Sequence, residues 1–119
     1  MNVALLKQYN IHFSTIKNSR GEIENHAEGG GLAEFLDDIY SSRDVSDGIA
    51  LAALYLGGGQ DPHGDDAIIA NAYAVYIAEN TATVVLFIDH TLPTLQELPL
   101  QDFHDIMVMW RDYLIQNGF

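Results

Sequence analysis

The chain has no cysteine, few basic residues and no long apolar run, and each of these absences excludes a class of protein. Without cysteine it can form neither a disulfide framework nor a thiolate site for zinc or nucleophilic catalysis. Since small secreted domains often depend on disulfides, we expect a cytoplasmic protein. No apolar stretch reaches the roughly 18 residues of a membrane span, and Met1–Lys7 does not resemble a secretory signal. We therefore expect no membrane partner.

Positive charge is scarce along the whole sequence. Seventeen acidic residues face five basic ones, which gives a formal net charge of −12 at pH 7. Binding to nucleic acid or to anionic lipid requires a basic surface, so we expect neither. A negative field instead speeds association with a basic protein and keeps a protein in solution. Solubility alone therefore remains an alternative explanation of the acidity.

The acidic excess is concentrated in about a third of the chain. Between Glu28 and Asp66 there are nine acidic residues and one basic residue, Arg43, so this segment has a net charge of −8. The concentration favours a dedicated acidic surface, and we predict that a basic partner docks there, on the first predicted helix, over Leu32–Ile39, and on the loop Gly57–Asp66. The predicted partner-binding residues are Glu34, Asp37, Asp38, Asp44, Asp61, His63, Asp65 and Asp66.

The apolar content is high enough for a folded core. Apolar residues make up 48% of the 119 residues, and twelve residues are aromatic. Highly charged chains that stay disordered lack such a fraction, and a chain of this length usually forms one domain. We expect a single domain over residues 1–119.

The first half of the sequence predicts one or two strands followed by two helices. Apolar and polar residues partly alternate over Tyr9–Ile16, which is typical of a half-buried strand, and Glu22–Asn25 is expected to form a short second strand. An apolar stripe at i, i+3, i+4 and i+7 predicts a helix over Leu32–Ile39. A second, alanine-rich helix is expected to begin at Ser46 and to stop at Gly57.

The second half predicts a β-hairpin and a closing helix. Ile68–Ala78 and Thr81–Asp89 are expected to be strands, joined by Glu79 and Asn80. A connector with two prolines leads into a helix with Trp110 in its buried stripe. The predicted fold class is therefore α+β, an antiparallel sheet of about four strands with helices packed on it, in the order β(β)-α-α-β-β-α.

Only the loop Asp61–Asp66 invites a metal-binding interpretation. Its carboxylates and imidazole are ligand types for a divalent cation, but their spacing matches no calcium loop, and a zinc site would need further His or Cys. We expect a solvated acidic loop, with no metal and no cofactor. No Ser/His/Asp or Cys/His set can be assembled, so we also expect no enzymatic activity.

A resemblance to a known group of proteins enters in the second half. The hairpin Ala72–Val85 is followed by Leu-Pro-Leu-Gln-Asp-Phe at 98–103 and by Trp-Arg-Asp-Tyr-Leu at 110–114. This arrangement resembles the small immunity proteins of bacterial polymorphic toxin systems, including contact-dependent growth inhibition. Several of these proteins end in a helix with a similar pattern.

The resemblance implies a function that agrees with the charge. Many toxins of these systems are nucleases with basic clefts, so the implied partner is a basic cognate toxin domain that the acidic protein covers and neutralises. Charge complementarity would give fast capture. The alternatives are another acidic protein-binding module, such as a nucleic-acid mimic or a regulatory subunit, and an enzyme built on the Asp61–Asp66 loop.

Overall fold

The computed structural model describes residues 2–64, 66–87 and 93–119, which form four helices and six strands. The elements in chain order are α1 (Val3–Gln8), β1 (Ile11–Lys17), β2 (Ile23–Gly29), α2 (Gly31–Asp38), α3 (Ser42–Leu56), β3 (Ala67–Ile69), β4 (Tyr73–Ala78), β5 (Thr81–Leu86), β6 (Thr94–Pro99) and α4 (Leu100–Gln116). The α+β class and a four-stranded antiparallel sheet with helices are confirmed.

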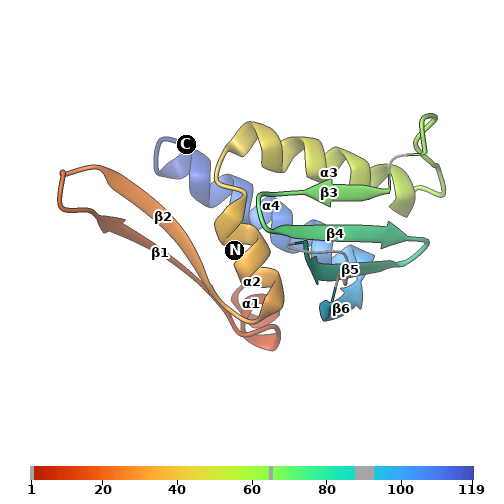
Figure 1. Cartoon of the computed structure of the whole chain (residues 1–119), viewed down its shortest axis with the longest axis horizontal. Helices are drawn as coiled ribbons and strands as arrows, with labels where there is room; N and C mark the ends of the chain where they lie inside the picture. Colours follow the sequence, from red (N-terminus) through yellow and green to blue (C-terminus); the bar gives the residue numbers. More distant parts are fainter. Residues whose placement is uncertain (1, 65, 88–92) are drawn as a thin grey trace.

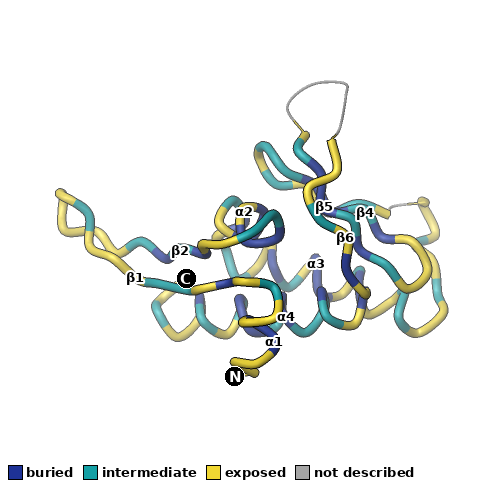
Figure 2. Tube along the Cα trace, turned by 90° about the horizontal axis from the view of Figure 1, so that it is seen from below, coloured by how far each residue is buried: buried dark blue, intermediate teal, exposed yellow. Residues whose placement is uncertain are grey.

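The strands form two separate antiparallel sheets. β3, β4, β5 and β6 pair in that order, whereas β1 and β2 form a hairpin that projects from the body of the molecule (Figure 1). The tip of this hairpin is exposed (Figure 2). Helix α2 contacts the hairpin and three strands of the larger sheet, so it joins the two sheets. Helices α3 and α4 pack against each other and against the larger sheet.

The core is organised around α4. Six of its side chains are fully buried at helical spacing, as the sequence stripe predicted: Leu100, Phe103, Ile106, Met107, Trp110 and Leu114. The indole Nε1–H of Trp110 donates to the carbonyl oxygen of Ile39 at 2.7 Å, and its ring lies 4.9 Å from that of Phe13 between centroids. Trp110 therefore connects α4, the end of α2 and the hairpin.

Two short elements escaped the sequence prediction. Helix α1 has only six residues, too few to show helical periodicity, and it is held by Asn2, whose side chain accepts a hydrogen bond from the Leu5 N–H. Strand β6 lies in the segment interpreted as a proline-rich connector. It is an edge strand, where proline is tolerated because the outward N–H groups have no partner in the sheet.

Several predicted boundaries were wrong. The first strand begins at Ile11 rather than Tyr9, and the second strand, expected over Glu22–Asn25, extends from Ile23 to Gly29. Helix α3 begins four residues earlier than Ser46, at Ser42, and Ser41 caps it by accepting a hydrogen bond from the Asp44 N–H. The earlier start places Val45 in the buried stripe with Ile49. The strand expected over Ile68–Ala78 is divided into β3 and β4, which pair with each other. Of the strand expected over Thr81–Asp89, residues 88 and 89 lie outside the described residues.

Within the described residues, no helix combines the length and the apolarity needed to cross a lipid bilayer.

Replacing Trp110 with alanine tests the organisation of this core. The side chain is fully buried, and its removal deletes the ring contacts with Phe13 and Tyr113 and one hydrogen bond. We expect the free energy of unfolding to fall by about 3–5 kcal/mol in denaturant titrations. Ile115→Ala, at an exposed position of the same helix, should change it by about 0.5 kcal/mol or less. A Trp110→Ala protein as stable as the parent would refute this packing.

Candidate functional site: an acidic groove at a sheet edge

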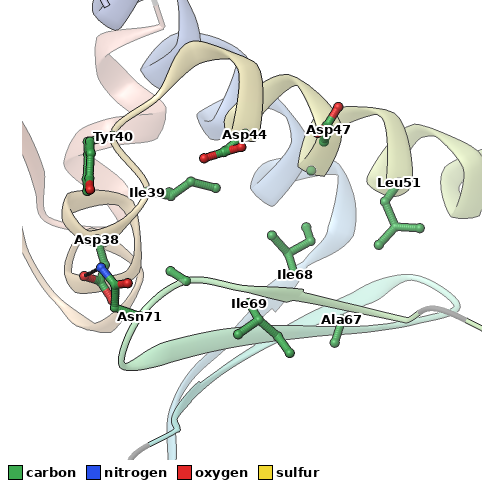
Figure 3. Close-up of a pocket in the computed structure, with 12 residues that line it drawn as sticks. Asp38, Ile39, Tyr40, Asp44, Asp47, Leu51, Ala67, Ile68, Ile69 and Asn71 are labelled. Carbon is green, nitrogen blue, oxygen red and sulfur yellow. Dashed lines mark hydrogen bonds between the residues drawn. The ribbon is translucent and has the colours of Figure 1, made fainter.

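A groove of about 590 Å³ lies between α3, the segment that follows α2, and the outer strand β3 (Figure 3). Its lining residues come from these three parts of the chain and are Asp38, Ile39, Tyr40, Asp44, Asp47, Gly48, Leu51, Ala67, Ile68, Ile69, Ala70 and Asn71. Three of them are acidic and none is Lys or Arg. Six of the other lining residues are apolar: Ile39, Leu51, Ala67, Ile68, Ile69 and Ala70.

Helix α3 and strand β3 approach each other closely at the groove. Gly48 is buried against Ile68: a Cβ atom at this position would lie 3.3 Å from Ile68 Cδ1 and 2.8 Å from Met107 Cε. Only glycine lets the helix pack this tightly on the strand. The preceding turn of α3 carries Asp44 and Asp47, so these two carboxylates lie along the helix side of the groove.

Asp38 has a structural role in addition to its place in the groove. One carboxylate oxygen accepts a hydrogen bond from the Ala72 N–H at 2.7 Å, and the other accepts from Asn71 Nδ2 at 3.1 Å. Both donors lie in the turn between β3 and β4. Asp38 therefore fixes this turn and anchors the end of α2 to the larger sheet.

Asp44 and Asp47 differ from Asp38. Both are exposed, and neither carboxylate forms a hydrogen bond or ion pair with any of the residues that the structure describes. Two unpaired negative charges at an apolar groove favour a cationic ligand, because an incoming ammonium or guanidinium group would gain ion pairs without displacing an existing one.

Asp37 lies on the opposite side of α2 and holds the hairpin. Its carboxylate accepts hydrogen bonds from the Ala27 N–H and from His26 Nδ1, both at 3.0 Å, while Glu24 lies 3.4 Å from His26 Nε2. Burial lowers the pKa of His26, but the hydrogen bonds to Glu24 and Asp37 and the charges of these two acids outweigh it, so the pKa lies above 6.5. Asp37 is thus bound to β2 rather than directed at the groove.

Glu34 also lies outside the groove. It is exposed on α2 and interacts with Tyr73 of β4. Burial raises the pKa of Tyr73, and the charge of Glu34 and its hydrogen bond raise it further.

The described loop residues of the prediction, Asp61, His63 and Asp66, do not line the groove. Asp61 closes a turn in which its carboxylate accepts from the His63 N–H at 2.8 Å. Asp66 is exposed directly before β3, and its carbonyl oxygen accepts from the Ile77 N–H. Asp65 lies outside the described residues. Over the described parts of this loop and of the rest of the chain, no group of three or more His, Asp or Glu side chains is placed to hold a metal ion.

Of the seven predicted partner-binding residues that the structure describes, Asp38 and Asp44 line the groove and the other five do not. The prediction missed Asp47, although this residue lies in the acidic segment 28–66, and it missed the contribution of strand β3. The exposure of Ile69, which is 60%, is the clearest feature of this strand. The exposure of Ile69 could not be predicted from the sequence, because an apolar residue at the end of a strand is usually expected to be buried.

No protein family matches the chain, and no curated protein or solved structure is significantly similar to it. The likeness to immunity proteins therefore remains an expectation from the sequence.

The two kinds of acid can be separated by alanine substitution. Asp38→Ala removes the acceptor of the Ala72 N–H, so the free energy of unfolding should fall by about 1–3 kcal/mol. Asp47→Ala removes an unpaired exposed carboxylate and should change it by about 0.5 kcal/mol or less. Chemical denaturation of both variants at pH 7 makes the comparison. Equal stability of the two would contradict a structural role for Asp38.

The raised pKa of His26 predicts a pH-dependent contribution to stability. Because the folded state holds the proton of His26 more tightly than the unfolded state, protonated His26 stabilises the protein. This stabilisation is fully present below pH 6.5 and is lost as the pH rises through the pKa of the folded state. The wild type should therefore exceed His26→Gln in stability at pH 5.5 by about 0.5 kcal/mol, the size expected of a partly exposed ion pair, and this difference should vanish by pH 8.5. Melting curves of both proteins across this pH range measure the difference in stability. A difference that grows with pH would contradict a raised pKa for His26.

Proposed function

We propose that this protein binds and neutralises a basic protein domain, as an immunity protein covers the substrate-binding surface of a nuclease toxin. The observation that carries the proposal is the groove beside β3, whose charged lining residues are all acidic and include two unpaired carboxylates, Asp44 and Asp47. In this function the protein acts in the cytoplasm, where it meets the toxin domain before nucleic acid is cleaved.

The charge of the whole chain supports the same type of partner. A net charge of −12 on 119 residues attracts a basic surface over a Debye length of about 8 Å at physiological ionic strength. Such steering raises association rates. The apolar residues that line the groove then offer the short-range contacts that slow dissociation. The net charge of the chain and the lining of the groove therefore both favour a basic protein as the partner.

The proposal is tested with the toxin-like domain that we expect to be encoded directly upstream of this chain. The Asp44→Asn/Asp47→Asn variant removes the two unpaired charges of the groove. The Glu28→Gln/Glu97→Gln variant is its control, because it changes net charge equally at two exposed positions outside the groove. Association and dissociation rates are measured at low and high salt by surface-immobilised binding.

We expect the groove variant to bind about tenfold more weakly at low salt and the control to bind within about twofold of the wild type. The difference should shrink as salt screens the charges. Wild-type protein should also restore the growth of cells that express the toxin-like domain. Equal weakening of both variants would assign the effect to net charge alone, and no binding or rescue by the wild type would reject the proposed function.

A further inference from the structure

The edge of strand β3 is free to pair with another strand. β3 is the outermost strand of the four-stranded sheet, and only β4 pairs with it among the described residues. The Ala70 N–H donates to Tyr73, and the Ile77 N–H donates to Asp66. Because hydrogen-bonded residues alternate along an antiparallel strand, residues 66, 68 and 70 face β4. The N–H and C=O groups of Ala67 and Ile69 therefore point outward, beside the groove.

The opposite edge of the sheet is protected. On β6, Pro99 has no N–H to donate, and the strand bulges where it pairs with Val84 and Val85. Helix α2 also packs closely on β6, since a Cβ atom at Gly31 would lie 2.8 Å from Leu95 Cβ. Prolines, bulges and covering helices are the usual means of blocking an edge. Within the described residues, β3 has no proline and no bulge, and the helix that packs on it, α3, contacts Ile68 on one face of the sheet and leaves the groove beside the strand.

We infer that the basic partner binds by adding an extended, antiparallel strand to the edge of β3, with a Lys or Arg side chain in the acidic groove. This inference rests on the proposed function, and it adds the mode of binding. Main-chain hydrogen bonds to Ala67 and Ile69 would provide affinity, and the groove would select the side chain, as in other cases of strand addition.

The side-chain directions of β3 determine the pattern of the added strand. Ile68 is buried and directed toward α3, whereas Ile69 is exposed on the other face of the sheet (Figure 3). A residue opposite Ile68 therefore enters the groove, where Leu51 and Ile39 can contact a long aliphatic stem and Asp44 its charged end. Its two neighbours lie opposite Ala67 and Ile69, where β-branched apolar residues fit. The expected pattern is apolar, basic, apolar.

Charge excludes a second copy of this chain as the occupant. Two copies would bring two net charges of −12 together, and the edge itself carries the exposed Asp66 directly before β3. Like charges on paired strands are destabilising. A basic segment of another protein instead complements every charged residue that lines the groove.

The test uses a synthetic peptide, acetyl-Thr-Val-Lys-Val-Thr-amide, and isotope-labelled protein followed by NMR. In the proposed register the two Val N–H groups face β3 and the Lys N–H faces solvent. N-methylation of both Val residues should weaken binding at least tenfold, whereas N-methylation of Lys, with the same charge, should weaken it less than threefold. Hydrogen exchange at the amides of Ala67 and Ile69 should slow at least fivefold on saturation with the unmodified peptide.

Two protein variants give the matching comparison. Ile69→Pro removes an outward N–H from β3 without deleting a bond to β4, and it should weaken the peptide at least fivefold. Glu97→Pro does the same on β6 and should leave binding unchanged, with folding of both checked by their NMR spectra. If a proline variant unfolds, the binding of the two methylated peptides to the wild-type protein still tests whether the peptide pairs with the edge of β3.

Several outcomes would overturn strand addition. Equal binding of the two methylated peptides would show that binding depends on charge and not on main-chain hydrogen bonds to β3. This result would refute strand addition but would not contradict the proposed function. Failure of the unmodified peptide to bind would refute this mode, while rescue from the toxin-like domain would still support the function. Protection of Ala67 and Ile69 in the peptide-free protein, together with dimerisation, would make a second copy the occupant.

Discussion

The carboxylate of Asp38 is the contact on which the geometry of the groove depends. By accepting the Ala72 N–H and the Asn71 amide, it joins the end of α2 to the turn between β3 and β4. This turn ends β3 after three residues. The β3 side of the groove is thus held to the end of α2 by two hydrogen bonds, one of them between residues that are 34 positions apart in sequence.

Helix α4 of the core contacts two residues that line the groove, Ile39 and Gly48. Trp110 donates its hydrogen bond to Ile39, the residue directly after Asp38, so the core helix α4 and the groove share a connection. Met107 of α4 meets α3 at Gly48, where α3 also contacts Ile68 of β3. The groove therefore sits on a packed base. A site on rigid elements loses less conformational entropy on binding than one on a flexible loop.

The sequence was sufficient to predict the elements that depend on a pattern of neighbouring residues. The stripe of α4 and the β4–β5 hairpin depend on periodicity within a few residues, and both are found where they were expected. The division of Ile68–Ala78 could not be predicted, because it depends on Asp38, which is distant in sequence. The acidic segment was identified from composition, but composition does not distinguish the bound carboxylates of Asp37 and Asp38 from the unpaired one of Asp44. That distinction requires the fold.

The central claim is that a basic partner occupies the acidic groove along the edge of β3. The most direct measurement is amide hydrogen exchange of this protein alone and in complex with the toxin-like domain expected upstream of it. The amides of Ala67 and Ile69 should gain the strongest protection, with smaller gains along α3 near Asp44 and Asp47. Protection confined to the β1–β2 hairpin, with β3 unchanged, would contradict it.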